Sequence, residues 1–111
     1  MDAAQRLGTY GTLAPGRPNH GQLAGIDGRW LRGTLRGHLV TAGWAASMGY
    51  PALVLDDDAP AVEVHIFESV DLPDHWARLD DFEGVEYERV ATIARTSVGE
   101  MTVSVYVLRS T

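Results

Sequence analysis

The sequence predicts an α+β domain in which β-strands outnumber helices. Short apolar runs rich in β-branched residues recur along the chain, whereas a single stretch has helical spacing. With 111 residues, 45% of them apolar, the chain can bury one hydrophobic core. No repeat or low-complexity segment divides it, so we expect residues 1–111 to form one domain.

Six runs have the composition of strands. They are apolar or alternating, and Gly, Pro and Asp residues that favour turns lie between them. We expect strands over residues 6–10, 33–40, 52–55, 62–67, 87–94 and 102–108, with a hairpin turn at 98–100. The stretch 11–21, rich in Gly and Pro, is expected to be a loop.

One segment has the spacing of a helix. Its apolar positions, four and then three residues apart, are Leu72, Trp76 and Leu79. Asp71 before this stripe is a plausible N-cap, and Pro73 suits the first turn. Gly84 is well placed to end the helix, because glycine readily adopts the left-handed conformation that often follows the last turn.

Glu83 lies one further step of four after Leu79, so the stripe predicts a partly buried carboxylate. Burial would raise its pKa, and so would the partial negative charge at a helix C-terminus. A carboxyl group shifted in this way can act as a general base near neutral pH. Two plainer readings stay open, in which Glu83 turns to water or pairs with Arg89. Asp80 and Asp81 fall beside or opposite the stripe and are expected to face solvent.

A second candidate site is the turn formed by Tyr10, Gly11, Thr12 and Leu13. Gly11 would let backbone N–H groups point at a bound carboxylate or carbonyl oxygen. The alternative is an ordinary strand that ends in a glycine turn.

Composition excludes several kinds of chemistry. The chain has no cysteine, so disulfides, zinc–thiolate sites and cysteine nucleophiles are ruled out, and all nine basic residues are arginine, so a Schiff-base lysine is impossible. No Gly-x-Ser-x-Gly motif marks a serine nucleophile. The four histidines are too scattered along the sequence to predict a metal site. These residues are His20, His38, His65 and His75.

Charge and hydropathy also narrow the choice of partner. The net charge is −6, and residues 51–111 carry thirteen acids against four arginines. We expect this half to be a solvated surface, and no nucleic-acid partner. The first half of the chain is richer in arginine, and its arginines could instead steer an anionic substrate toward the protein. They include Arg17, Arg29, Arg32 and Arg36. No apolar run is long enough for a membrane span and no secretory signal is evident, so a soluble, cytoplasmic protein is expected.

The motifs taken together resemble the γ-glutamylcyclotransferase-like family, which includes AIG2-like proteins and γ-glutamylamine cyclotransferases. Residues 10–13 resemble its Tyr-Gly-Ser/Thr-Leu turn, and residues 79–84 resemble its Leu-Asp-x-x-Glu-Gly signature. Further matches follow in order along most of the chain, at residues 33–39, 49–53, 87–89 and 105–107.

This resemblance implies a small mixed β-barrel, partly closed and flanked by helices, in which the turn and Glu83 face one cavity. It implies an enzyme that releases 5-oxoproline from a γ-glutamyl amine or peptide, with Glu83 as the general acid/base. The α-amino group of the substrate attacks its own γ-carbonyl, so no enzyme nucleophile is needed and we expect no cofactor and no metal. Tyr10, Gly11, Thr12 and Leu13 would bind the substrate, and Tyr87 and Tyr106 are candidates for the cavity wall.

Two departures from the family pattern bear on the substrate. Val64 and His65 stand where relatives often have a Gly-Glu pair, and residues 44–49 resemble an insertion. Both are expected to reshape the cavity. An alternative of a different class is a non-catalytic module of the same fold that binds a small carboxylate. A structural partner protein would need a large exposed apolar surface, which nothing in the sequence demands.

Overall fold

The computed structural model describes residues 2–10, 20–40 and 52–109. Six strands and one α-helix make up most of this part of the chain: β1 (Arg6–Thr9), β2 (Arg29–Val40), β3 (Ala52–Leu55), β4 (Ala61–Glu68), α1 (Trp76–Glu83), β5 (Tyr87–Thr96) and β6 (Gly99–Leu108). Three short 3-10 turns accompany them: η1 (Ala3–Gln5), η2 (His20–Gln22) and η4 (Leu72–His75). The segments 11–13 and 44–49, which the sequence analysis singled out, lie outside the described residues.

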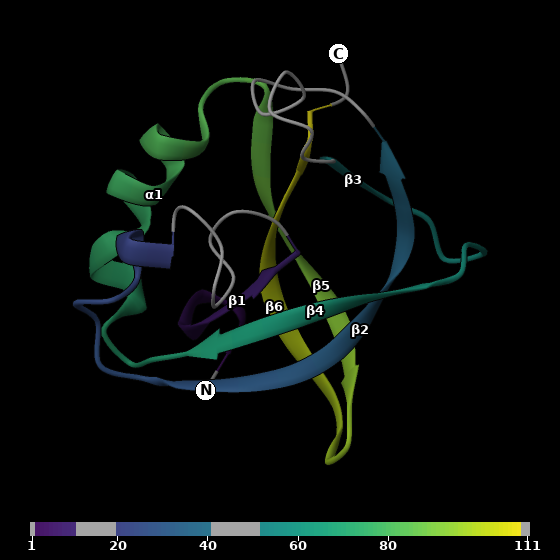
Figure 1. The fold of residues 1–111 in the computed structure, drawn as a ribbon, viewed down its shortest axis with the longest axis horizontal. Coiled ribbons are helices and arrows are strands. Elements are labelled where there is room, and N and C mark those ends of the chain that lie inside the picture. The colour runs from purple at the N-terminus through teal and green to yellow at the C-terminus, as the bar shows by residue number, and fades with distance from the viewer. Residues whose placement is uncertain (1, 11–19, 41–51, 110–111) are drawn as a thin grey trace.

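The strands form a small mixed barrel, which confirms the predicted fold. Five of them follow the order β2-β4-β1-β6-β5, and a further pairing of β5 with β2 closes the ring. The fourth strand in chain order, β4, and its neighbour β2 cross β5 and β6 steeply (Figure 1). The pairing of β1 with β6 is parallel, and the other strand pairings described are antiparallel.

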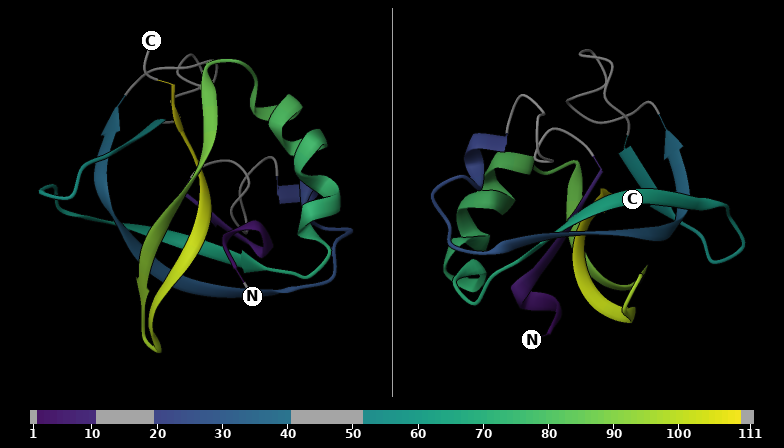
Figure 2. Two further views of the ribbon diagram at one scale, coloured as in Figure 1. Left: turned by 180° about the vertical axis from the view of Figure 1, so that it is seen from behind. Right: turned by 60° about the horizontal axis from the view of Figure 1, so that its bottom comes forward.

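The barrel is only partly closed. The closing contact between β2 and β5 consists of two residue pairs, Gly33 with Thr96 and Thr34 with Arg95. Beyond them the two strands diverge, and the last four residues of β2, 37–40, pair with β3 instead. Figure 2 shows the long curve of β2 that this arrangement requires.

Several strands are longer than the sequence predicts. β2 begins at Arg29 rather than at residue 33, because residues 29–36 pair with β4 in continuous register. The hairpin of β5 and β6 extends to Thr96 and Gly99, where Gly99 adopts a φ of 112°. At the other end of the chain, β1 stops one residue short of Tyr10.

The helical segment confirms the predicted apolar stripe but not the predicted cap. Residues 72–75 form the 3-10 turn η4, and the α-helix proper starts at Trp76. Asp71 makes no capping side-chain bond, because its backbone already has helical dihedrals (φ −89°, ψ −9°), whereas an N-cap needs an extended one. The hydroxyl of Ser69 accepts a hydrogen bond from the Asp71 N–H instead, at 3.1 Å.

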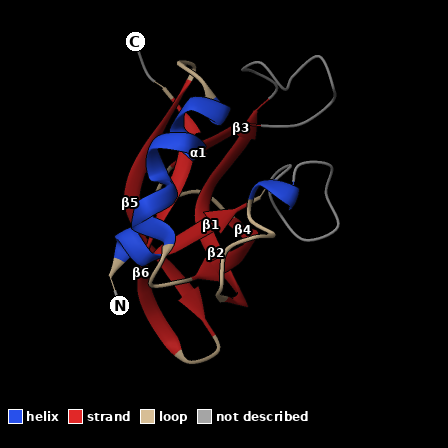
Figure 3. Cartoon of the chain, turned by 90° about the vertical axis from the view of Figure 1, so that its left-hand side faces the viewer, coloured by secondary structure: helices blue, strands red, loops and turns tan. Residues whose placement is uncertain are grey.

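The core has two parts, on either side of β6. Inside the barrel, apolar side chains from five strands meet, among them Leu35, Leu53, Ile66, Val103 and Val105. Beneath α1 lies a second cluster that contains Leu7, Leu72, Trp76, Leu79, Tyr87 and Tyr106. α1 therefore lies alongside β5 and β6 (Figure 3). None of the helices in the described part of the chain is long and apolar enough to cross a membrane.

Candidate functional site

Glu83 is the last residue of α1 and is partly buried, as its place in the apolar stripe predicts. Burial raises the pKa of its carboxyl from 4.5 to about 7. Gly84 ends the helix with a φ of 87°, and its N–H donates to the carbonyl of Asp80 at 3.0 Å. The helix therefore delivers a carboxyl group that changes its charge near neutral pH.

Three tyrosines lie close enough to Glu83 to respond to its charge. Burial is the main cause of the raised pKa of Tyr10, Tyr87 and Tyr106, and the Glu83 carboxylate raises the pKa of each of them further. They come from three places in the chain: the residue after β1, the first residue of β5 and the last third of β6. The fold thus brings four of the predicted site residues together.

The hydroxyl of Tyr10 bonds to backbone groups of two strands. It donates to the carbonyl of Tyr106 at 2.8 Å and accepts from the N–H of Leu53 at 3.0 Å. A phenol can donate one hydrogen bond, and here the acceptor is a backbone carbonyl of β6. Tyr10 therefore fixes the point from which residues 11–13 depart, and the binding role of Gly11, Thr12 and Leu13 stays a prediction.

Next to Glu83 is a cluster that the sequence analysis did not identify. Arg89 on β5 forms a two-point ion pair with Asp80, at 3.0 and 3.2 Å, so the reading in which Arg89 pairs with Glu83 is wrong. The hydroxyl of Tyr106 also donates to Asp80, at 2.6 Å. Asp80 is exposed, as expected, and it also bonds to both strands beneath the helix. The available signal was the spacing of Trp76, Asp80 and Glu83, which places them on one face of a helix.

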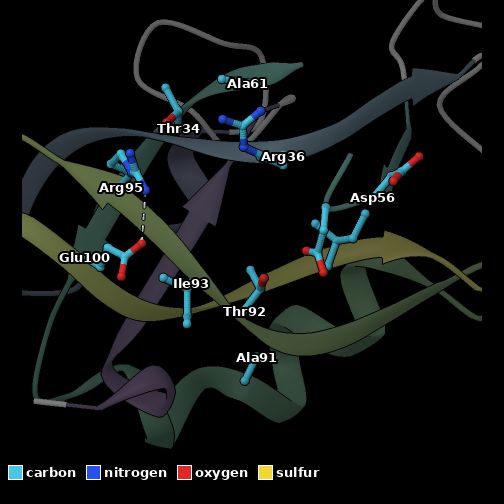
Figure 4. Close-up of a pocket in the computed structure, with 11 residues that line it drawn as sticks. Thr34, Arg36, Asp56, Ala61, Ala91, Thr92, Ile93, Arg95 and Glu100 are labelled. Atoms are coloured by element: carbon cyan, nitrogen blue, oxygen red, sulfur yellow. Dashed lines mark hydrogen bonds and ion pairs between the residues drawn. The ribbon is translucent and has the colours of Figure 1, made fainter. Parts of the chain in front are cut away.

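A groove of about 800 Å³ lies elsewhere, where β2 and β5 diverge. Its lining includes Arg36, Asp56, Ile93 and Arg95, and Figure 4 shows the ion pair of Arg95 with Glu100 at one end of it. None of the candidate site residues described above lines this groove.

The arginines proposed to steer an anion are partly engaged within the protein. Arg29 pairs with Glu68 at 2.7 Å, and Arg36 donates to the carbonyl of Ala59 at 3.0 Å. Arg17 lies outside the described residues. Within residues 2–10, 20–40 and 52–109, no three His, Asp or Glu side chains gather as a metal site would require.

The two residues that depart from the family pattern lie on β4. Val64 is buried in the barrel interior, and the ring of His65 lies edge-on to Trp30, 6.5 Å away between centroids. Their effect on the substrate stays a prediction.

Solved structures from three organisms share this fold. YkqA from Bacillus subtilis has a TM-score of 0.73 at 26% identity, over 96% of this chain and 36% of that one. An AIG2-like protein from Mus musculus has a TM-score of 0.75 at 25% identity, over 96% of this chain and 78% of that one. PH0828 from Pyrococcus horikoshii, at 20% identity, has a TM-score of 0.64 over 96% and 79% of the two chains. This last similarity shows the fold alone.

The sequence itself gives a family. The chain matches no curated protein. It spans only about a third of the length of YkqA, since the match covers 36% of that chain. The family model described as "Gamma-glutamyl cyclotransferase, AIG2-like" matches residues 8–111, which include Tyr10 and Glu83. The chain therefore belongs to the AIG2-like gamma-glutamyl cyclotransferase family.

Proposed function

We propose that this protein releases 5-oxoproline from a γ-glutamyl amine or γ-glutamyl peptide, with Glu83 as the general acid/base. The observation that carries the proposal is the state of Glu83. This residue belongs to the run 79–84 that resembles the family's Leu-Asp-x-x-Glu-Gly signature, and burial brings its pKa to about 7. Both the proton-accepting and the proton-donating forms of the carboxyl group are then populated at neutral pH.

The reaction is an intramolecular aminolysis. The α-amino nitrogen of the γ-glutamyl group forms a bond to the γ-carbonyl carbon, the γ-amide C–N bond breaks, and the amine leaves. Two protons leave the α-nitrogen, one before it attacks and one as the lactam forms. The Glu83 carboxylate takes the first from the α-ammonium group, and the resulting carboxylic acid gives it to the departing nitrogen; the second follows the same route, so the amine leaves as an ammonium ion. Atoms balance without water, cofactor or an enzyme nucleophile.

Substrate binding falls to the turn at residues 10–13. Backbone N–H groups of Gly11, Thr12 and Leu13 hold the α-carboxylate or stabilise the oxyanion that develops on the γ-carbonyl. Tyr10 contributes by fixing the start of this turn through its bonds to Tyr106 and Leu53. Tyr87 and Tyr106 form the wall beside Glu83, where their burial keeps the phenols protonated.

The test is a screen for released 5-oxoproline over γ-glutamyl amines, γ-glutamyl dipeptides and γ-glutamyl-modified lysine. The Glu83→Gln variant is expected to fold and to lose turnover by a factor of about 10² to 10⁴. Asp81→Asn is the matched control, because Asp81 is an exposed carboxylate on the same helix. Turnover retained in Glu83→Gln would exclude the proposed role of this residue.

The screen also separates the enzyme from a non-catalytic binding module. A module would release no 5-oxoproline from any compound, yet a small carboxylate such as 5-oxoproline would raise its melting temperature. That combination of results would replace the proposed activity with binding alone.

A further inference from the structure

Asp80 is tied at once to both strands that support α1. Its Oδ1 accepts hydrogen bonds from the Arg89 guanidinium of β5, at 3.0 Å, and from the Tyr106 hydroxyl of β6, at 2.6 Å. Its Oδ2 accepts a second bond from Arg89 at 3.2 Å. Arg89 and Tyr106 are directly opposite each other in the β5–β6 pairing, so one carboxylate spans the two strands.

Arg89 is in turn held by the helix. Its guanidinium carbon lies 4.3 Å from the centre of the Trp76 ring, and the rings of Trp76 and Tyr106 meet edge to face with 6.4 Å between their centroids. Trp76 is itself fixed, because its indole N–H donates to the carbonyl of Ala4 at 2.8 Å. We call these four residues, Trp76, Asp80, Arg89 and Tyr106, the helix clamp.

The helix clamp acts one turn away from Glu83. Trp76, Asp80 and Glu83 are spaced by four and three residues, so they share a face of α1. The carbonyl of Asp80 accepts the N–H of Gly84 at 3.0 Å, which closes the turn that contains Glu83. Terminal turns of helices fray unless other groups hold them, and α1 has only eight residues.

The two neighbouring carboxylates respond to their surroundings in opposite ways. Burial opposes the charge on Asp80, but the hydrogen bonds from Arg89 and Tyr106 outweigh it and lower the pKa of Asp80. The charge of Glu83 raises the pKa of the Tyr10, Tyr87 and Tyr106 phenols, and its own pKa is raised by burial. Asp80 therefore stays ionised as a fixed anchor over the range in which Glu83 gains and loses its proton.

We propose that Asp80 and Arg89 are positioning residues, which hold the last turn of α1 against β5 and β6 and thereby fix the Glu83 carboxyl in its partly buried place. This role rests on the proposed function of Glu83. The Asp80–Arg89 pair is well placed for a test, because its side chains are 44% and 30% exposed and such pairs contribute little to global stability. Loss of the pair should change the site more than the fold.

The experiment compares Arg89→Gln, Asp80→Asn and Arg89→Lys with the parent protein. Lysine keeps the charge over Trp76 but loses the two-point contact with Asp80. Arg95→Gln is the matched control, because Arg95 lies on the same strand and pairs with Glu100 at 3.4 Å outside the site. Two quantities are measured: kcat and KM for 5-oxoproline release, and the titration midpoint of the Glu83 carboxyl carbon by NMR.

We expect Arg89→Gln and Asp80→Asn to lower kcat by about ten- to a hundredfold with KM changed less than about threefold. The Glu83 midpoint should fall by about one pH unit as water reaches the loosened turn. For Arg89→Lys, both kcat and the Glu83 midpoint should lie between the values of these variants and those of the parent. If Arg89→Gln or Asp80→Asn does not fold, the values of Arg89→Lys test the positioning role. The control should match the parent in both quantities.

Unchanged kcat or an unchanged Glu83 midpoint in folded Arg89→Gln and Asp80→Asn would overturn the positioning role. If the parent protein turns over none of the γ-glutamyl compounds, the proposed function fails. The NMR midpoint still decides whether the clamp holds Glu83, because that measurement needs no substrate.

Discussion

The hydroxyl of Tyr10 donates a hydrogen bond to the backbone carbonyl of Tyr106, 2.8 Å away, and so links the end of β1 to β6. The same oxygen accepts the N–H of Leu53 on β3, at 3.0 Å. One side chain therefore connects three strands at the point where the candidate substrate turn begins. Burial raises the pKa of this phenol well above its usual range, so the phenol keeps its proton at neutral pH.

The first prediction concerns this bridge. Tyr10→Phe removes the hydroxyl and leaves a partly buried N–H and carbonyl without their partner, which should lower the free energy of unfolding by about 1 to 2 kcal/mol. Urea denaturation measures the change. Thr96→Val is the control, because the Thr96 hydroxyl also bonds to two backbone groups, Gly99 and Val98, but in an exposed turn. Equal losses in the two variants would contradict a structural role specific to Tyr10.

The second prediction follows from the raised pKa of Glu83. A carboxyl whose pKa rises on folding, here from 4.5 to about 7, binds more protons in the folded state between these values, so it lowers stability as the pH increases through this range. Glutamine has no charge to bury at any pH. Glu83→Gln should therefore be more stable than the parent at pH 8, with a gain about 2 kcal/mol larger than at pH 5.

Denaturant curves at pH 5, 6, 7 and 8 measure this difference. Glu100→Gln serves as control, because Glu100 is an exposed carboxylate whose loss should change stability little at each pH. A gain for Glu83→Gln that is the same at pH 5 and pH 8 would show that Glu83 is fully hydrated in the folded protein.

Much of the site was predictable from local spacing. The stripe of Leu72, Trp76 and Leu79 depends only on the helical repeat, and so does the partial burial of Glu83. Gly84 ends the helix for a reason that also lies in the sequence, since it adopts a φ of 87°. The order of the strands along the chain could also be predicted from the sequence, although β2 begins four residues earlier than predicted.

The helix clamp was not predictable in this way. Whether Arg89 pairs with Asp80 or with Glu83 depends on how β5 packs against α1. Helical periodicity carries no information about this packing. The bond from Tyr106 to Asp80 depends further on the register that places Tyr106 opposite Arg89. The closure of the barrel could not be predicted either, because it depends on two residue pairs, Gly33 with Thr96 and Thr34 with Arg95, whose members lie far apart in the sequence.

The third prediction concerns Glu68, which is 6% exposed and bonds to two arginines. Arg6 donates to one of its oxygens at 2.8 Å and Arg29 to the other at 2.7 Å. These three residues occupy one row across β1, β4 and β2. Glu68→Gln removes the charge that both arginines share, so it should cost about 2 to 3 kcal/mol of stability at pH 7.

The contribution of Glu68 to stability changes with pH in the opposite direction to that of Glu83. The hydrogen bond from Arg6, followed by that from Arg29, lowers the pKa of Glu68 below its usual value. Its contribution is therefore present above pH 4.5 and is lost as the pH falls through the lowered value. The difference between Glu68→Gln and the parent should shrink in acid, and a difference that persists at pH 2 would contradict the ion-pair account.

The fourth prediction tests the barrel closure at Gly33. A Cβ added at this position would lie 2.9 Å from the Arg95 carbonyl oxygen of β5 and 2.9 Å from the Ile66 side chain. Gly33 is thus the residue that lets β2 approach β5 closely enough to pair. Gly33→Ala should force the two strands apart and lower the free energy of unfolding by about 1 to 3 kcal/mol.

Gly25→Ala separates this steric effect from the general effect of replacing glycine. A Cβ at Gly25 would meet nothing within 4 Å, so its substitution should be neutral or raise stability by about 0.5 kcal/mol, because alanine restricts the unfolded chain. Hydrogen exchange supplies the local readout: among residues 33, 34, 95 and 96, the amides that bond across the β2–β5 contact should lose protection in Gly33→Ala and keep it in Gly25→Ala. Since Glu83 lies at the α1 end of β5 rather than at this closing contact, 5-oxoproline release should fall less in Gly33→Ala than in the clamp variants. A larger fall would mean that the closing contact, and not the clamp, determines where Glu83 lies.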